Sequence, residues 1–219
     1  MKPLPKEEIQ RKLLHLFALL MPAGIHYFPK FGLQWWVATL ILGLLLAGSI
    51  VIERLRQASP AVQELFYKFV GSMLRKEEKH ATTGSTWVIG AAFVCSIVFR
   101  NDTWVAFVVL TLFVLGDAVA ALVGMSMGRI KIGKKSLEGS AACFTLCMLF
   151  FVAVFPFVPG LFGPCGGRIP FWVALVTSFT ITIFELVPLR ISPKIIINDN
   201  LAVPVIAGFV LRWLTAVSA

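Results

Sequence analysis

The sequence predicts an all-α polytopic membrane protein, with about seven transmembrane helices and one amphipathic helix at the cytoplasmic interface. Composition is the first observation: of 219 residues, 58% are hydrophobic and 14% are charged, whereas a typical soluble domain carries about 25% charged residues. The mean hydropathy of +0.86 agrees with this. The second observation is that apolar stretches of membrane-spanning length alternate with polar loops. We therefore expect residues 1–219 to form a single membrane-embedded domain.

Seven apolar stretches are the expected membrane spans. They comprise residues 13–28, 35–52, 84–99, 103–125, 138–157, 169–188 and 200–214. Basic residues precede the first stretch as they would in a signal peptide, but no clean cleavage site follows it, so we expect a retained span. The sequence leaves open whether the short third stretch crosses the membrane fully.

The distribution of positive charge predicts the orientation of these spans. Of the 20 lysine and arginine residues, 16 fall on the N-terminal side of a seven-span arrangement and only four on the opposite side. Lysine and arginine are enriched in cytoplasmic loops. We therefore expect the N-terminus and the active site to be cytoplasmic and the C-terminus to lie on the other side. The membrane would be a cell inner membrane or one of the endoplasmic-reticulum type.

The longest loop contains the predicted interfacial helix, at about residues 60–76. Its apolar residues recur at the i, i+3, i+4 and i+7 spacing of an amphipathic helix. These residues are Val62, Leu65, Phe66, Phe69, Val70, Met73 and Leu74. Such a helix lies in the headgroup plane of a membrane. It could floor a lipid-accessible cavity or act as a passive connector, and the sequence leaves both alternatives open.

Five acidic residues fall in the predicted spans or at their ends, all toward the cytoplasmic half. A charged group costs roughly 2.5–3.5 kcal/mol at the centre of a bilayer, so such groups usually face a cavity or a partner. The five are Asp117, Glu185, Glu53, Glu138 and Asp199. Their common depth suggests a shared hydrophilic cavity. Asp117, Glu138, Glu185 and Asp199 are the predicted ligands of Mg²⁺, which proteins usually hold by one or two carboxylates together with phosphate oxygens.

Four basic residues crowd the loop at about residues 126–140, namely Arg129, Lys131, Lys134 and Lys135. The loop nearly matches G-x-x-x-x-G-K-[ST], but no buried strand precedes it, so we reject a P-loop NTPase. Glycine backbone and lysine charge still suit the binding of phosphate. The predicted nucleotide-binding residues of this region are Gly124, Gly128, Lys131, Lys134, Ser136, Gly139 and Ser140.

Structural explanations exist for several of these residues. Ser136 is a plausible N-cap of the following helix, where the exposed N–H groups also favour an anion. Glu138 could hold a metal or simply complement the helix dipole. Small residues recur every four positions from Gly116 through Gly124 to Gly128, which is also the pattern of tight helix packing.

Two further polar clusters lie near span ends. Arg11, Lys12 and His15 begin the first span and could bind phosphate, with His15 tuning a proton, although basic residues are expected at cytoplasmic ends in any case. At the start of the last span, helix capping explains one of Asn198, Asp199 and Asn200 but not all three. Asp199, the acidic residue of the three, could bind a Mg²⁺ together with Glu185.

Four motifs then carry a resemblance to a known family. In order, they are Arg11-Lys12-x-x-His15, Gly116-Asp117-x-x-Ala120-x-x-x-Gly124-x-x-x-Gly128, Lys135-Ser136-x-Glu138-Gly139-Ser140 and Asp199-Asn200-Leu201-x-Val203-Pro204. Together they resemble the CTP-dependent lipid-alcohol kinases: dolichol kinase, phytol kinase and the CTP-using diacylglycerol kinase. The resemblance implies phosphorylation of a lipid hydroxyl by a nucleoside triphosphate, typically CTP, with a divalent metal. It points to site residues at Arg11, Lys12, Asp117, Gly124, Lys135, Ser136, Glu138 and Asp199.

The resulting hypothesis is a magnesium-dependent kinase for a polyprenol, dolichol, phytol-like alcohol or diacylglycerol, with no nucleic-acid partner. Its predicted catalytic residues are Asp117, Asp199, His15 and Lys135; Arg11, Lys12 and Asn200 would help to bind the nucleotide. Either Asp199 or His15 could be the base. The alternatives are a phosphatidate cytidylyltransferase-like enzyme and an ion-coupled transporter, although the inverted repeats typical of many transporters are not visible. Nothing in the sequence indicates an oligomeric state.

Overall fold

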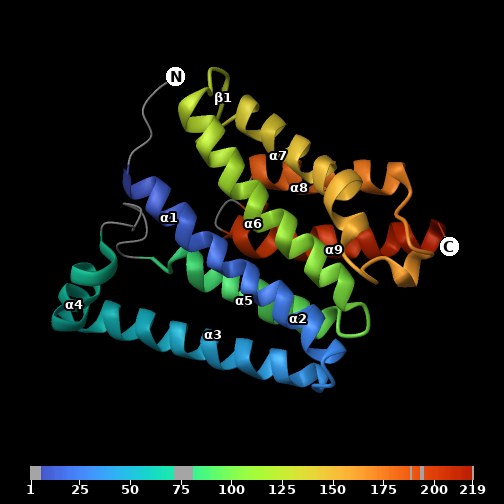
Figure 1. The fold of residues 1–219 in the computed structure, drawn as a ribbon. Helices are drawn as coiled ribbons and strands as arrows, with labels where there is room; N and C mark the ends of the chain where they lie inside the picture. Colours follow the sequence, from blue (N-terminus) through green and yellow to red (C-terminus); the bar gives the residue numbers. More distant parts are fainter. Residues whose placement is uncertain (1–5, 72–80, 188, 193–194, 219) are drawn as a thin grey trace.

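The computed structural model describes residues 6–71, 81–187, 189–192 and 195–218, and helices dominate it (Figure 1). The first part of the chain forms α1 (Lys6–Leu16), a 3₁₀ turn η1 (Phe17–Leu19), α2 (Leu20–Lys30), α3 (Trp35–Ala58), α4 (Pro60–Val70), α5 (Gly84–Val98) and α6 (Thr103–Ser126). The second part forms α7 (Leu137–Leu149), a π-helical turn η4 (Phe150–Val154), the 3₁₀ turns η5 (Phe155–Phe157) and η6 (Gly163–Cys165), α8 (Phe171–Leu186) and α9 (Asp199–Ser218). The expected helical architecture is therefore present.

Four helical segments in the described residues are long and apolar enough to cross a membrane. They are α3, α6, α7 with its extension to Phe157, and α9. Helices α5 and α8 are apolar but shorter, and the first predicted span is divided between α1 and α2 by η1. The structure thus fits a helical membrane protein, and the count of seven spans stays a prediction.

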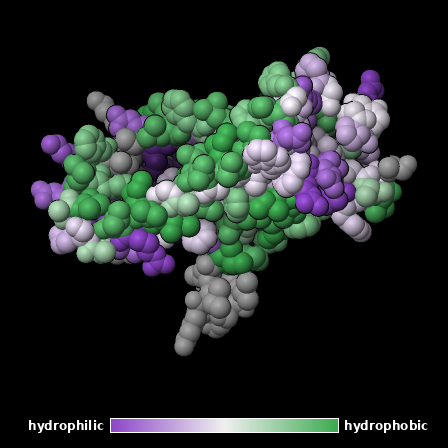
Figure 2. Space-filling view, turned by 90° about the horizontal axis from the view of Figure 1, so that it is seen from below, coloured by the Kyte–Doolittle hydropathy of each residue, from purple (hydrophilic) through white to green (hydrophobic). Residues whose placement is uncertain are grey.

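Helix α6 is the centre of the molecule. Its residues are buried along most of its length, and it lies between the α1–α2 pair and the helices α7 and α9 (Figure 1). The start of α1 and the end of α9 lie at opposite ends of the bundle (Figure 1). Figure 2 shows a broad hydrophobic band with hydrophilic residues gathered at both ends, and a recess near the left end with a hydrophilic floor. This pattern suits a molecule surrounded by lipid at its middle.

Small residues allow α6 and α7 to approach each other closely. A Cβ atom at Gly124 would lie 2.8 Å from Ser136 Oγ, and one at Gly139 would lie 2.5 Å from the backbone oxygen of Ala120. A Cβ at Gly116 would lie 2.8 Å from the sulfur of Cys143. The four-residue ladder of small residues is therefore used for helix packing.

Two short hairpins add to the all-α architecture that the sequence predicts. Strands β1 (Lys131–Ile132) and β2 (Lys135–Ser136) pair antiparallel between α6 and α7, and β3 (Arg190–Ser192) pairs with β4 (Ile195–Ile196) between α8 and α9. Gly133 has φ +61°, a conformation that glycine adopts without steric cost. This glycine lets the predicted nucleotide loop fold back on itself as a hairpin.

Helix α4 occupies the first part of the predicted interfacial helix. It ends at Val70, and residues 72–76 of the prediction lie outside the described residues. Leu65 and Phe69 point outward, with 58% and 71% of their surface exposed, whereas Phe66 faces the bundle. An apolar outer face is what a helix at a membrane surface requires.

Candidate active site

The first cluster joins the N-terminal basic motif to the acid of α6. The ammonium of Lys12 donates to the carbonyl oxygen of Asp117 at 3.2 Å and also forms an ion pair with its carboxylate Oδ2. His15 Nε2 lies 3.5 Å from the same oxygen, and Arg11 pairs with Glu8 one helical turn away. Lys12 is only 5% exposed. Residues 105 positions apart in the sequence therefore form one compact cluster.

The second cluster gathers one lysine and two acids from three different elements. Lys135 Nζ of β2 lies 2.9 Å from Glu185 Oε1 of α8 and 2.8 Å from Asp199 Oδ2 of α9. Burial alone lowers the pKa of Lys135, but the two carboxylates outweigh burial, so the pKa is raised and the ammonium stays charged. Glu185 Oε2 is buried without a hydrogen-bond partner among the described residues.

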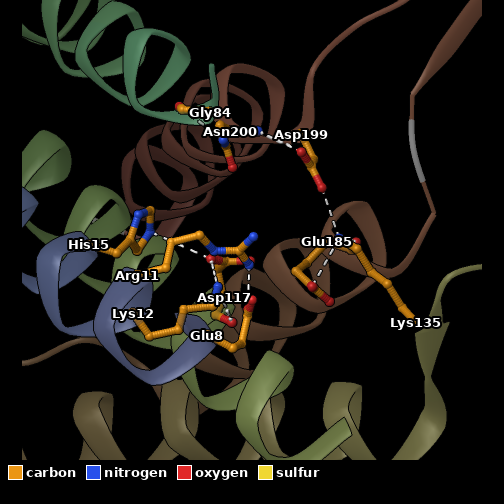
Figure 3. Close-up of polar contacts among 10 residues, drawn as sticks. All are labelled: Glu8, Arg11, Lys12, His15, Gly84, Asp117, Lys135, Glu185, Asp199 and Asn200. Carbon is orange, nitrogen blue, oxygen red and sulfur yellow. Dashed lines mark hydrogen bonds and ion pairs between the residues drawn. The ribbon is translucent and has the colours of Figure 1, made fainter. Parts of the chain in front are cut away.

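The two clusters adjoin each other. Asp117 is close enough to Lys135 and Glu185 to interact with them electrostatically. In Figure 3, Asp117 with its lysine and histidine lies to the left of the Lys135 cluster, and Asn200 and Gly84 lie above. The Asn200 side chain donates to the Gly84 carbonyl at 3.1 Å. The start of α9 therefore contacts both sides of the site, through Asp199 toward Lys135 and through Asn200 toward α5.

The α6–α7 hairpin has an exposed face and a buried face. Arg129, Lys131 and Lys134 are exposed, although Lys131 Nζ also donates to the Gly124 carbonyl at 3.3 Å. Ser136 is buried, and its hydroxyl accepts a hydrogen bond from Gly139 N at 3.1 Å. This confirms Ser136 as the N-cap of α7.

The remaining residues of the loop form hydrogen bonds to the nearby backbone or pack closely against it. Glu138 accepts hydrogen bonds from Ile130 N at 3.1 and 3.4 Å, and Ser140 Oγ donates to the Ser136 carbonyl at 3.2 Å. Gly128, like Gly124, is packed against Ser136. Contacts of Gly124, Gly128, Ser136, Gly139 and Ser140 with nucleotide remain predictions, and in this structure these residues shape the hairpin.

The predicted metal ligands are only partly brought together. Among the described residues, no three histidine, cysteine or acidic side chains lie together in a way that could hold a metal ion. Glu185 and Asp199 share one ammonium group, Asp117 is paired with Lys12, and Glu138 turns to Ile130. Two neighbouring carboxylates fit Mg²⁺ when phosphate oxygens and water complete its coordination. The donor set therefore fits a metal that arrives with a polyphosphate, not a site made by protein alone.

A cavity of about 490 Å³ opens beside the first cluster. Its polar end is formed by Arg11, Lys12, His15, Asp117 and Asn200. Its apolar wall comes from α1, η1, α2, α3 and α5 and comprises Leu14, Phe17, Ala18, Leu20, Met21, Leu45, Val88 and Ile89. A cavity that is apolar along its wall and charged at its end suits an amphiphile with a polar head.

Sequence reasoning missed part of the cavity wall. Thr83, Gly84 and Ser85 at the start of α5 line it, as does Phe66 of α4. The amphipathic pattern of α4 signalled that this helix could floor a cavity. The residues around Thr83 predicted the start of a span and gave only a weak signal of a role near the site. Glu53, expected in the shared cavity, instead pairs with Arg56 in a separate buried cluster.

Comparison of the sequence with those of known proteins places the chain in a family. A CTP-dependent diacylglycerol kinase of Schizosaccharomyces pombe is 30% identical over an alignment 224 residues long, gaps included. The alignment covers 94% of this chain and 93% of the relative. The chain belongs, as a distant member, to the CTP-dependent diacylglycerol kinase family. The enzyme of the same name from Saccharomyces cerevisiae is 29% identical over 161 residues, covering 67% of this chain and 51% of the relative. An uncharacterized protein of Rickettsia prowazekii is 23% identical over 90% of this chain and 89% of the relative.

No protein-family model matches the sequence, and no solved structure matches it. Membership of the CTP-dependent diacylglycerol kinase family supports, in general terms, a lipid kinase that uses CTP.

Proposed function

We propose that this protein transfers the terminal phosphate of CTP to the hydroxyl of a membrane lipid alcohol, with Mg²⁺. One observation carries the proposal. The amphipathic cavity ends at Asp117, and Asp117 adjoins the Lys135–Glu185–Asp199 cluster behind the basic hairpin. A lipid held in the cavity would thus present its polar end to the place where an anionic, metal-bound nucleotide is expected.

The acceptor occupies the cavity in this proposal. Its hydrocarbon part packs on the apolar wall, and its hydroxyl lies near Asp117 and His15. The sequence left His15 and Asp199 as possible bases. His15 lines the cavity, whereas Asp199 is directed to Lys135. Because a base must reach the proton that it removes, we assign this role to His15, with Asp117 orienting its ring.

The donor nucleotide lies on the hairpin side in this proposal. Arg129, Lys131 and Lys134 offer exposed positive charge for its phosphates. Glu185 and Asp199 would hold the magnesium ion, which neutralises phosphate charge when it is bound. Phosphoryl transfer depends mainly on positioning and electrostatic stabilisation, so the enzyme does not require a strong nucleophile of its own.

Purified protein incubated with CTP or ATP, Mg²⁺ and a panel of diacylglycerol and isoprenoid alcohols tests the proposal. The expected products are CDP and a lipid monophosphate. Pyrophosphate and a CDP-lipid would instead identify a cytidylyltransferase. Absence of turnover with every lipid and both nucleotides would remove the kinase assignment.

A further inference from the structure

A second buried charge pair lies beside the cavity and outside the reaction centre. Arg56, in the last turn of α3, is 1% exposed, and Glu53 is 6% exposed. Arg56 Nε donates to Glu53 Oε2 at 3.1 Å, and Nη2 donates both to that oxygen and to the Ala81 carbonyl, the latter at 2.8 Å. The other Glu53 oxygen accepts from Thr83 N at 2.9 Å and from Thr83 Oγ1 at 2.6 Å.

This pair connects three elements. Glu53 and Arg56 belong to α3, Thr83 is the residue before α5, and the guanidinium carbon of Arg56 lies 5.1 Å from the centre of the Phe66 ring of α4. A planar guanidinium held at several acceptors has one preferred orientation, and a cation over an aromatic ring favours one position of that ring. The pair thus fixes Phe66 relative to the start of α5.

The partners of this pair line the cavity, but the pair itself does not. Among the described residues, the wall includes Phe66 and Thr83 but neither Glu53 nor Arg56. Burying an ion pair is seldom favourable in itself, because desolvation offsets much of the attraction. A gain in stability is therefore a weak explanation for the presence of the pair. Its contacts with Phe66 and Thr83 offer a more specific one, since they fix the positions of these two wall residues.

We propose that Glu53 and Arg56 are positioning residues that hold Phe66 against the start of α5, and that Phe66 thereby selects acceptors by the bulk next to their hydroxyl. The inference rests on the proposed function and names the specificity determinant of its acceptor cavity. Phe66 is well placed for this role because the start of α5, to which the pair ties it, also reaches the polar end of the cavity. Gly84, the residue after Thr83, accepts a hydrogen bond from Asn200 at 3.1 Å. Leu65 and Phe69 are exposed on the outer face of α4. Helix α4 therefore presents one face to the surroundings and another to the cavity.

The test compares two acceptors that differ in bulk beside the hydroxyl: diacylglycerol and a single-chain isoprenoid alcohol. The full-length protein is assayed in lipid nanodiscs for kcat and KM with each acceptor, and for the KM of CTP. Phe66→Ala should shift the ratio of kcat/KM toward diacylglycerol by about tenfold, since contacts of this size in an apolar pocket discriminate by about 10–200-fold. Phe66→Trp should shift it the opposite way. The KM of CTP should stay close to that of the wild-type protein, because no residue of the α6–α7 hairpin lines the cavity.

The pair is tested by replacing both charges with apolar residues of similar size, Glu53→Leu with Arg56→Met. This double variant should relax the acceptor ratio in the direction of Phe66→Ala. Arg56→Lys keeps the charge but loses the fork of donors, so it should also relax the ratio. Phe69→Ala, on the outer face of the same helix, is the matched control and should keep the wild-type ratio.

Several results would overturn the inference. Equal losses of kcat/KM with both acceptors in an active Phe66→Ala protein would show that Phe66 does not select between them. A wild-type ratio in the active double variant would remove the role of the charge pair. If Phe66→Ala fails to fold, an unchanged ratio in the larger Phe66→Trp variant decides against the inference. A wild-type protein that phosphorylates no lipid would instead contradict the proposed function.

Discussion

At the scale of single residues, the site depends on charges that compensate one another. Lys12 and Asp117 form an ion pair at the end of the cavity. Lys135 forms ion pairs with both Glu185 and Asp199. Removing one member of such a pair leaves the other charge without compensation in a poorly solvated place. Substitutions that keep shape but remove charge therefore separate chemistry from packing.

Asp117→Asn should lower kcat by about 100-fold or more, the loss typical when a group that stabilises charge in a reaction is removed. The amide keeps the volume of the side chain but can neither compensate Lys12 nor orient the charged form of His15. Steady-state kinetics of the purified variant measures the effect. Asp102→Asn is the matched control, because Asp102 lies away from the site. Its Oδ2 is paired with Arg212 Nε at a distance of 3.0 Å. Undiminished turnover in Asp117→Asn would remove Asp117 from the mechanism.

Lys135→Met should make the thermal stability of the protein responsive to Mg²⁺. Without the ammonium, Glu185 and Asp199 repel each other, and a divalent cation that binds the folded state restores stability by mass action. The thermal unfolding midpoint should fall in the variant and recover in part with millimolar Mg²⁺. Adding Asp199→Asn to Lys135→Met should abolish this recovery. An equal recovery in both variants would show that the ion acts elsewhere.

At the scale of elements, the α6–α7 contact sets the shape of the hairpin. Ser136 is the N-cap of α7, and its buried side chain lies against Gly124 of α6 and Gly128 just after that helix. Any side chain at these glycines would push α7 and its hairpin away from α6. The position of Lys135 in β2 therefore depends on close helix packing below it.

Gly139→Ala should destabilise the protein by about 1–3 kcal/mol, the usual cost of overpacking. The added methyl group would meet the backbone oxygen of Ala120 at 2.5 Å, and backbone cannot rotate away. Gly48→Ala on α3 is the control, since a Cβ there meets nothing within 4 Å and alanine favours helix by about 1 kcal/mol. Unfolding midpoints of the two variants measure the contrast. Equal stability of both would contradict the close contact.

At the scale of the whole molecule, the site lies at one end of the bundle. The start of α1, the α6–α7 hairpin and the start of α9 meet there, while α9 ends at the far end (Figure 1). The distribution of lysine and arginine predicts that this end is cytoplasmic. The orientation is thus a property of the entire chain that no single contact decides.

Cysteine labelling from each side of a sealed membrane tests that orientation. A cysteine in place of Lys134 should react with a membrane-impermeant reagent only from the cytoplasmic side. A cysteine in place of Gly163, in the loop between α7 and α8, should react only from the other side. Cys95, Cys143 and Cys147 are buried, and Cys165 is replaced by serine to remove background. Labelling of both positions from the same side would contradict an odd number of crossings between them.

The periodicity of apolar residues and the positions of the charged residues were sufficient to predict the helical membrane fold and much of the candidate site. The depth of Asp117, Glu185 and Asp199 followed from hydropathy. In the structure Glu185 and Asp199 share Lys135, and Asp117 is paired with Lys12 beside them. For Glu138 the sequence left open a purely structural role, and the side chain accepts hydrogen bonds from Ile130 N. The sequence did not indicate that Glu53 leaves this group of acids, because an acid's partner depends on helix rotation, and Glu53 pairs with Arg56. The hairpins were missed for a related reason, since strands of two or three residues contain too few positions for an alternating pattern.

CTP carrying distinguishable labels on its α- and γ-phosphates tests the central claim most directly. After incubation with the full-length protein, Mg²⁺ and diacylglycerol in nanodiscs, the label recovered in extracted lipid identifies the group transferred. The account predicts that the γ-label alone reaches the lipid and that the α-label remains in CDP. Recovery of the α-label in the lipid with release of pyrophosphate would contradict it.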